Sequence, residues 1–161
     1  MVEIKIVNID AGIGNQLMIG QAGFIKTAED VYEALMNASP GIKFGLAFSE
    51  ASGPCLVRTE GNDVELQSLA ERNATAIGAG HSFVIIFKNA FPININNAVK
   101  AVPEVVGIFC ATANQVQVVV AETEQGRGIL GVIDGYSPKG VEQQMDKDKR
   151  KKFLRDLGYK M

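Results

Sequence analysis

The 161-residue sequence has no tryptophan, a single histidine and only two cysteines. Tryptophan is common in sugar-binding clefts, so its absence disfavours a site of that kind. One histidine and two cysteines without C-x-x-C spacing are too few for a Cys/His zinc site or an H-E-x-x-H motif. Cys55 and Cys110 lie in apolar runs, and we expect both to be reduced and buried in a cytoplasmic protein.

The chain also lacks an excess of charge and a long apolar run. Sixteen Lys and Arg against 18 Asp and Glu give a net charge of −2, which provides no basic surface for nucleic acid or anionic lipid. No apolar run reaches the roughly 20 residues of a membrane-spanning helix, and residues 1–9 are too short and too charged for a signal peptide. We therefore expect neither a nucleic-acid nor a membrane partner. The length predicts one domain spanning residues 1–161.

The G-K-S/T phosphate loop, the G-x-S-x-G elbow and the H-R-D and D-F-G elements of protein kinases are all absent. A G-x-G-x-x-G pattern is present at residues 126–131. The dinucleotide-binding motif needs a helix to begin at its last glycine, but here an apolar, β-branched run follows at 129–133. Two interpretations remain: a glycine hairpin over a nucleotide's phosphates, with Arg127 pairing with an anion, or a simple hairpin turn.

Segments of strand and helix periodicity alternate along the chain without a linker. Residues 17–22 are expected to pair with residues 2–9 as a returning strand. Thr27 and Asp30 resemble a capping box for the first helix, and Asn62 or Asp63 can cap the second. The pattern predicts the α/β class, a single-domain three-layer sandwich with a mixed β-sheet flanked by helices. Its strands are 2–9, 17–22, 42–48, 55–58, 81–88, 105–111, 116–121 and 129–133, and its later helices are 94–102 and a charged one at 141–157.

Polar residues cluster where the apolar strands stop, which is where open α/β sheets bind ligands. Asp134, between an apolar strand and Gly135, is the first choice for a general base, because burial there would raise its pKa. Each candidate also has a purely structural interpretation, such as turn chemistry or a structural histidine. The candidates at strand ends are Glu50, Ser52, Gly53, His81, Thr112, Asn114 and Asp134.

Amide side chains, cations and glycine loops make up the remaining polar inventory. Amides such as Asn94 and Asn114 can read base edges and ribose hydroxyls, whereas Lys26, Arg58, Arg127 and the glycine backbones can hold phosphate. This set suits a nucleoside or nucleotide. The residues alone indicate no more than a small polar ligand.

Several segments resemble the adenosine-specific kinase family nearly end to end. They include Glu-Ala-Ser-Gly-Pro at 50–54, Gly-Ala-Gly-His-Ser-Phe at 78–83, Ala-Thr-Ala-Asn at 111–114 and Gly-Arg-Gly-Ile-Leu-Gly-Val at 126–132. The resemblance implies a compact α/β subunit in a homo-oligomer, with a trimer favoured, and adenosine or AMP as ligand. It implies phosphoryl transfer from ATP, with Mg²⁺, to the adenosine 5′-hydroxyl. Gly23 stands where the family usually has a histidine.

Under this resemblance, Asp134 or Glu50 would accept the hydroxyl proton, while Arg127, Lys26 and His81 would stabilise the transferring phosphoryl group. Glu50 or Glu122 would hold Mg²⁺, without a separate protein metal site. Further ligand contacts are expected from Ser52, Gly53, Asn94, Thr112, Asn114, Gly126 and Gly128. One alternative is a non-catalytic sensor or buffer of adenosine or AMP that uses the same pocket. A weaker alternative is a nucleotide hydrolase.

Overall fold

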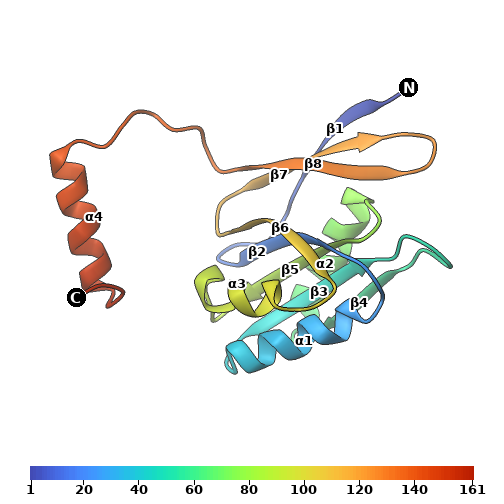
Figure 1. The fold of residues 1–161 in the computed structure, drawn as a ribbon, viewed down its shortest axis with the longest axis horizontal. Helices are drawn as coiled ribbons and strands as arrows, with labels where there is room; N and C mark the ends of the chain where they lie inside the picture. The colour runs from blue at the N-terminus through green and yellow to red at the C-terminus, as the bar shows by residue number, and fades with distance from the viewer.

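The computed structural model describes all 161 residues as four helices and two antiparallel sheets (Figure 1). The α/β class predicted from the sequence is confirmed. The larger sheet has the order β4 (Val57–Gly61), β3 (Lys43–Ser49), β5 (Ser82–Lys88), β2 (Gln16–Ala22) and β6 (Val105–Thr112). The smaller sheet has the order β1 (Glu3–Asn8), β7 (Val116–Glu122) and β8 (Arg127–Asp134).

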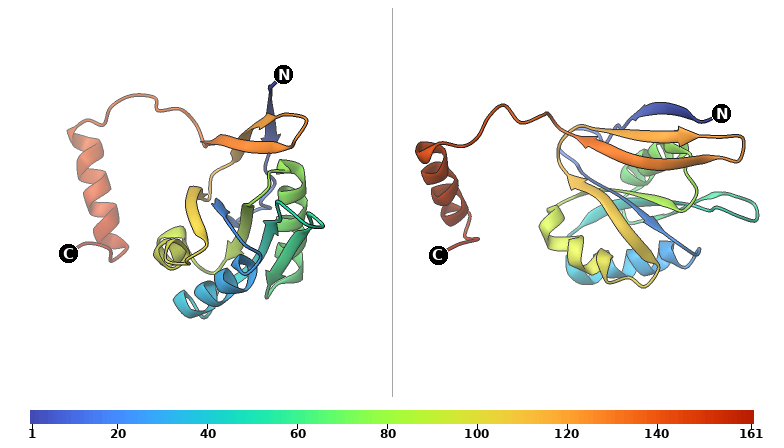
Figure 2. Two further views of the ribbon diagram at one scale, coloured as in Figure 1. Left: turned by 45° about the vertical axis from the view of Figure 1, so that its right-hand side comes forward. Right: turned by 45° about the horizontal axis from the view of Figure 1, so that its top comes forward.

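The elements stack in three layers (Figures 1 and 2). Helices α1 (Thr27–Ala38) and α3 (Pro92–Lys100) cover one face of the larger sheet. Helix α2 (Val64–Ile77) and the smaller sheet cover the other face. A hydrophobic core fills each interface, and β5 supplies both because its alternate residues point to opposite faces. Phe83, Ile85 and Phe87 face α1 and α3, whereas Val84 and Ile86 face α2.

The strand directions differ from the predicted mixed sheet, because every strand pair in both sheets is antiparallel. All residues of β5 except Lys88 are buried. A strand without a polar face is typical of a parallel sheet with both faces covered. Here an antiparallel sheet is covered on both faces, so it gives the same sequence pattern.

Two pairs of strands that follow each other in the chain lie in different sheets. The expected hairpin between residues 2–9 and 17–22 is absent, because β1 pairs with β7 while β2 pairs with β5 and β6. The connecting loop is instead fixed to α2. The backbone N–H of Asp10 donates to Asn73 Oδ1 at 3.0 Å, and Asn73 Nδ2 donates to the Asp10 carbonyl at 2.7 Å. The segment after β6 likewise crosses to the smaller sheet at β7.

The helix ends follow local sequence signals in α2 but not in α1. Asp63 caps α2, accepting the backbone N–H of Leu66 at 3.1 Å, and Gly78 ends that helix at φ +64°, both as expected. The predicted capping box of α1 does not form. The Thr27 hydroxyl donates backwards to the Phe24 carbonyl at 2.7 Å, and Asp30 pairs with Lys26 instead.

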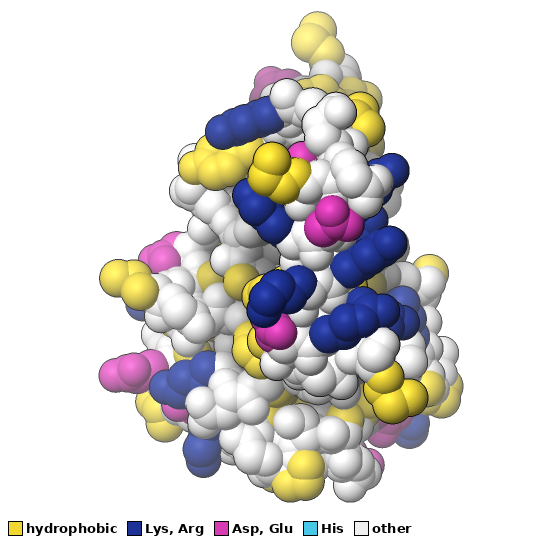
Figure 3. Space-filling model, turned by 90° about the vertical axis from the view of Figure 1, so that its left-hand side faces the viewer, with side chains coloured by type: hydrophobic (Ala, Val, Ile, Leu, Met, Phe, Trp, Pro, Cys, Tyr) yellow, Lys and Arg dark blue, Asp and Glu magenta, His cyan; other side chains and the backbone are white.

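Helix α4 (Gln144–Asp156) lies apart from the rest of the chain in every view, at the end of an extended segment (Figures 1 and 2). It contains no buried residue, and Lys and Arg side chains gather on the face that it presents (Figure 3). The charged, solvated helix predicted for 141–157 is therefore confirmed. None of the four helices has the length and apolar character needed to cross a membrane.

Candidate functional site

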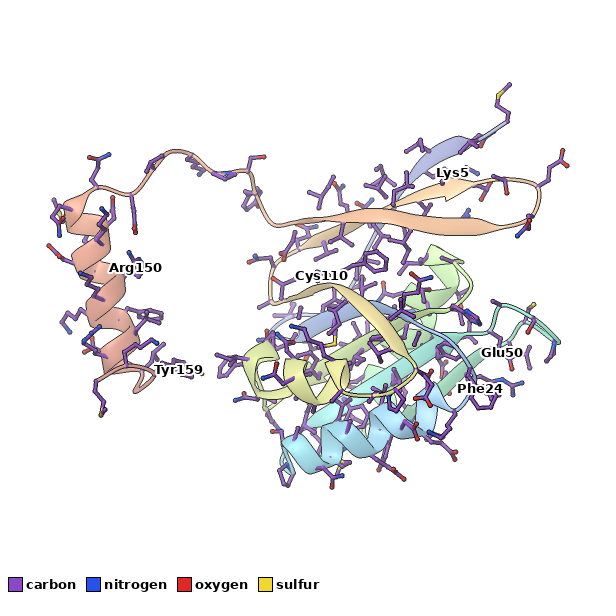
Figure 4. The ribbon with its side chains drawn as sticks, in the orientation of Figure 1. Lys5, Phe24, Glu50, Cys110, Arg150 and Tyr159 are labelled. Atoms are coloured by element: carbon purple, nitrogen blue, oxygen red, sulfur yellow. The ribbon has the colours of Figure 1, made fainter.

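One end of the larger sheet brings together three of the predicted site residues. Glu50 follows β3 and His81 precedes β5. The backbone N–H of His81 donates to the Ser49 carbonyl at 2.8 Å, and the Ala22 N–H donates to the His81 carbonyl at 2.8 Å. Lys26 lies four residues beyond Ala22, at the start of α1. We call this the Glu50 end of the sheet; Figure 4 labels Glu50 and Phe24 there.

Strained backbone is concentrated at the Glu50 end. Of the four non-glycine residues with positive φ, three lie here: Phe24 at +79°, Cys55 at +50° and His81 at +64°. Such conformations cost on the order of 1 kcal/mol or more each, and they cluster at ligand sites. The imidazole of His81 also stacks on Phe48, with ring centroids 6.0 Å apart. The strain and the stacking hold His81 in a fixed orientation.

Buried polar atoms without a partner are concentrated at the same end. They are Ser49 Oγ, Arg58 Nε and Glu104 Oε2, three of the four such atoms in the chain. Leaving a buried polar atom unpaired costs about 1–3 kcal/mol. A ligand that supplied the missing hydrogen bonds would recover that cost. The Glu50 end is therefore the part of the fold best prepared for a polar ligand.

Glu50 is held as a carboxylate by two neighbours. Its Oε2 accepts the backbone N–H of Leu56 at 2.8 Å, and its Oε1 accepts Arg58 Nη2 at 2.8 Å. The Leu56 bond first, and then Arg58, hold the pKa of Glu50 below its ordinary value of 4.5. Glu50 is consequently an anchored hydrogen-bond acceptor at neutral pH.

The lowered pKa predicts a pH dependence of stability. Because folding lowers the pKa of Glu50, its contribution is complete above pH 4.5 and is lost as the pH falls through the lower folded value. We expect Glu50→Gln to lower the melting temperature at neutral pH, and the difference from wild type to shrink progressively below pH 4.5. Thermal melts of both proteins, from neutral pH to below pH 4.5, measure this difference in melting temperature. Glu71→Gln, on the exposed side of α2, is the control; an unchanged Glu50→Gln difference at low pH would contradict the assignment.

Lys26 is the second charged group at this end. It pairs with Asp30 and, at 3.0 Å, with Glu104. The hydrogen bond to Asp30 first, and then that to Glu104, raise the pKa of Lys26 above 10.5. The ammonium group therefore stays protonated throughout the physiological range.

Two clefts adjoin at the Glu50 end and share Val57. The first, here the glycine cleft, has a volume of about 710 Å³, and Glu50, Cys55, Thr75, Gly78, Gly80, Gly126, Arg127 and Gly128 are among its lining residues. The second, here the charged cleft, has a volume of about 720 Å³ and is lined by Phe24, Ile25, Lys26, Ala28, Glu29, Val57, Arg58, Thr59 and Glu60. Both volumes are in the range of small-molecule sites. The Glu50–Arg58 ion pair links one cleft to the other.

The glycine-rich segment forms the β7–β8 hairpin, which confirms the strand–glycine–strand context. Its arginine is already engaged. Arg127 pairs with Glu122, and its Nη1 donates to the carbonyls of Ala76 and Ile77 at 3.0 and 3.3 Å. These carbonyls belong to the last turn of α2, where a cation is favourable. Arg127 thus neutralises a helix C-terminus, and its predicted contact with phosphate stays a prediction.

We expect Arg127→Met to destabilise the fold by about 1–2 kcal/mol, because it leaves helix carbonyls without a donor and Glu122 with one fewer partner. It should leave the ratio of AMP to adenosine affinity unchanged, because Glu122 and the helix carbonyls already hold the guanidinium. Urea denaturation and calorimetry measure the two effects. Arg72→Met, on an exposed part of α2, is the matched control. A selective loss of AMP affinity would restore the phosphate role.

Asp134, Asn114 and Thr112 lie at the opposite end of the structure. Asn114 Nδ2 donates to Asp134 Oδ1 at 3.1 Å, and the Asn114 backbone N–H donates to Thr112 Oγ1 at 3.0 Å. Asp134 is exposed, whereas the sequence predicted burial. Arg127 and Asp134 occupy the two ends of β8, roughly 24 Å apart at the rise of an extended strand. Within one subunit they cannot act on the same phosphoryl group.

Three other predicted ligand contacts lie outside both clefts. Asn94 accepts the backbone N–H of Phe91 at 2.8 Å, which caps α3, and it lines a separate cleft of about 780 Å³ beside residues 12–16. Ser52 and Gly53 are exposed in the β3–β4 turn, with Gly53 at φ +63°. These positions match the structural alternatives: a helix cap and turn residues.

The two cysteines, both free thiols, differ in environment. Cys110 is buried as expected, and burial first, with Asp134 second, raises its pKa to about 11. Cys55 is exposed in the β3–β4 turn, contrary to the prediction. An apolar neighbour on each side suggested burial, but the turn lifts the residue away from the core.

Comparison with known proteins gives the same family as the sequence motifs. The model of the family described as adenosine specific kinase matches residues 7–160. The chain belongs to this family. The crystal structure of the PH1918 protein from Pyrococcus horikoshii OT3 superposes with a TM-score of 0.96 at 46% sequence identity, covering 100% of this chain and 99% of that chain. A search of curated proteins gives no match.

The family name implies ATP, which kinases use as its Mg²⁺ complex. Nowhere in the structure do three or more His, Cys, Asp or Glu side chains lie together in a group that could hold a metal ion. Mg²⁺ on a nucleotide needs only one or two carboxylates, because phosphate oxygens and water supply its other ligands. Glu50 and Glu104 are carboxylates at the Glu50 end; Leu56 and Arg58 hold both oxygens of Glu50, and Lys26 binds Glu104 Oε1, so an ion there would displace one of these partners. Glu122 is engaged in the same way, since Lys5 and Arg127 both bind it.

Sequence reasoning missed Glu104, Phe24 and Ser49 as members of this site. Glu104 follows a proline in an irregular turn, and no motif singles it out. It reaches the site only because β6 runs antiparallel to β2, which places Val105 opposite Ala22. The chemistry of Arg58 was visible in the sequence, but its pairing with Glu50 was not.

Proposed function

We propose that this protein binds adenosine or AMP at the Glu50 end and transfers a phosphoryl group from ATP to the adenosine 5′-hydroxyl. The observation that carries the proposal is the pair of adjoining clefts, because one is lined by glycines and has no free cation whereas the other is lined by Lys26 and Arg58. The C-terminal turn of α2 borders the glycine cleft, and the N-terminal turn of α1 borders the charged cleft. In a nucleoside 5′-phosphate, the nucleoside suits the glycine cleft and the phosphate suits the charged cleft.

The glycine cleft suits the nucleoside. Arg127 is the one Lys or Arg that lines it, and Glu122 and the carbonyls of α2 already hold that side chain, so the cleft offers no free cation to a phosphate. Adenosine is neutral, and its amino group and ribose hydroxyls can all donate. Gly78, Gly80 and Gly126 let the ligand approach the backbone closely. The anchored Glu50 carboxylate can accept a bond from a ribose hydroxyl.

The charged cleft suits the phosphate. The first turn of α1 lines it. The Thr27 and Ala28 N–H groups there already donate to the Phe24 and Ile25 carbonyls, so the phosphate contacts come from side chains. Arg58 gives only Nη2 to Glu50 and has an unpaired, buried Nε. Its remaining donors and the Lys26 ammonium can make charge-assisted bonds to phosphate oxygens. The exposed ring of Phe24 closes one side of this cleft.

In the proposed reaction, Glu50 orients the 5′-hydroxyl, and Lys26 and Arg58 stabilise the charge on the transferring phosphoryl group. Phosphoryl transfer depends mainly on positioning and electrostatic stabilisation, so a carboxylate with a low pKa is sufficient. His81, fixed beside Phe48, is the second group available to accept a proton. Bound ATP with Mg²⁺ would supply the phosphoryl group, and Glu50 or Glu104 would hold the ion. Asp134 has no part in this assignment.

A non-catalytic sensor or buffer of adenosine or AMP is the second candidate. Gly23 favours it, because the histidine usual in the family is missing at the Glu50 end. A Cβ at this position would meet no atom within 4 Å, so the backbone does not require a glycine there.

The test is binding followed by turnover on the purified full chain. Adenosine and AMP are titrated by calorimetry; adenosine, ATP and Mg²⁺ are then incubated with the protein, and AMP is measured by chromatography. We expect both ligands to bind and AMP to form well above the rate without protein. Binding without AMP formation would select the sensor. An absence of binding would reject both candidates.

A further inference from the structure

Ser49, the last residue of β3, carries a hydroxyl that is buried and has no hydrogen-bond partner. The residue is only 7% exposed, and its Oγ is one of the four unpaired buried polar atoms of the chain. The backbone around it is fixed, because its carbonyl accepts the His81 N–H at 2.8 Å and the residue pairs with Val57 of β4. An unpaired buried hydroxyl destabilises a fold. Its presence at a rigid strand end indicates a hydrogen bond that a ligand completes.

The hydroxyl of Ser49 faces the glycine cleft. Side chains alternate between the two faces of a strand. Ala47 packs in the core beneath α2, whereas Phe48 packs in the core beneath α1 and α3, so Ser49 shares the α2 face with Ala47. The glycine cleft lies on that face beside the last turn of α2, and Ser49 lines it. Among the residues that line this cleft, Ser49 alone has a buried, unpaired polar atom.

The other hydroxyls that line the glycine cleft are paired within the protein. Thr75 Oγ1 donates to the Glu71 carbonyl at 2.8 Å, and Thr123 Oγ1 accepts the Gln125 N–H at 3.2 Å. The Ser49 hydroxyl has no such competing partner. Because a hydroxyl can both donate and accept, it is able to bind another hydroxyl in either direction. A ligand that places a hydroxyl group at this point of the cleft therefore satisfies Ser49.

Ser49 lies where the two clefts meet. Its register partner across β3 and β4 is Val57, the residue that both clefts share. The next residue, Glu50, forms the ion pair with Arg58 that links the clefts (Figure 4 labels Glu50). In the proposed function the nucleoside lies in the glycine cleft and the phosphate in the charged cleft, so the sugar that joins base and phosphate spans this junction. Ser49 therefore faces the sugar rather than the base.

We propose that the Ser49 hydroxyl binds the 2′,3′-diol of the ribose, so that this protein selects ribonucleosides over their deoxy forms. The inference rests on the proposed binding of adenosine or AMP, and it makes the sugar a part of the ligand that the site reads. Glu50, one residue further on, orients the 5′-hydroxyl, so two consecutive residues hold the same sugar. A deoxy sugar leaves the buried hydroxyl unpaired, and a site built to bind a hydroxyl rejects the analogue that lacks it.

The experiment titrates adenosine, 2′-deoxyadenosine and 3′-deoxyadenosine by calorimetry into full-length wild type and Ser49→Ala. Wild type should bind at least one deoxy analogue about tenfold more weakly than adenosine, the factor that one hydrogen bond contributes. Ser49→Ala should bind adenosine about tenfold more weakly than wild type does, and it should no longer distinguish adenosine from that analogue. Thermal melts without ligand give a second readout. Ser49→Ala should melt no lower than wild type, because the hydroxyl that it removes has no partner.

Ser82→Ala is the matched control, because Ser82 is also buried but lies outside both clefts, and its Oγ donates to the Ala79 carbonyl at 2.7 Å. It should lower the melting temperature and keep the preference for adenosine.

Equal affinity of wild type for all three nucleosides would overturn this inference alone, since adenosine would still bind. A sugar preference that Ser49→Ala retains in full would overturn it too. A lower melting temperature of Ser49→Ala without ligand would give the hydroxyl a structural role instead. A wild type that binds none of the three nucleosides would reject the proposed function itself, and this inference with it.

Discussion

Replacing Arg58 by methionine is expected to weaken AMP binding by about 30-fold while changing adenosine binding by less than about threefold. A charge-assisted hydrogen bond contributes about 2 kcal/mol, which corresponds to this factor. The variant also frees the Glu50 carboxylate, now held at 2.8 Å by the guanidinium, to repel the phosphate. Adenosine lacks the phosphate and in the proposed arrangement occupies the glycine cleft. Its affinity therefore reports whether the fold is intact.

Calorimetric titration of each ligand measures this difference. Arg72→Met makes the same change on an exposed helix position and should alter neither affinity. Arg58→Lys keeps the charge but loses the forked geometry, and it should fall between wild type and Arg58→Met. Equal losses for adenosine and AMP would place Arg58 against the nucleoside. Unchanged AMP affinity would remove Arg58 from the site.

Replacing Gly45 by alanine is expected to cost about 3 kcal/mol of stability, a large share of the 5–15 kcal/mol typical of a domain. Gly45 lies in β3 where α2 crosses the sheet. A Cβ there would lie 2.2 Å from the backbone N of Gln67 and 2.2 Å from the backbone C of Leu66. These are backbone atoms of a helix, so α2 itself must move away from the sheet. The glycine cleft, built partly from the end of α2, should lose ligand affinity as well.

Urea denaturation measures the stability of Gly45→Ala. Gly107→Ala is the matched control, because Gly107 is also a strand glycine but a Cβ there would meet nothing within 4 Å. The control should differ from wild type by less than about 1 kcal/mol. If both variants were equally stable, the close contact of α2 with β3 would be wrong.

Local sequence signals predicted the features that short segments encode by themselves. The aspartate at position 63 and the glycine at 78 specify the ends of α2, because a cap needs only the residues of one turn. The run of apolar residues around the 126–131 glycines predicted the β7–β8 hairpin for the same reason. Family motifs along the chain also indicated the adenosine specific kinase family. These are properties of adjacent residues.

Strand partners and the grouping of site residues were decided by the tertiary structure. Strand β1 pairs with β7, more than 100 residues away in sequence, and no local pattern distinguishes that partner from β2. This choice depends on which apolar faces can be buried together. The pairing of β2 with β6, also distant in sequence, brings Glu104 to Lys26. The sequence by itself determined the elements and the family, and long-range packing decided which end of the sheet could become the site.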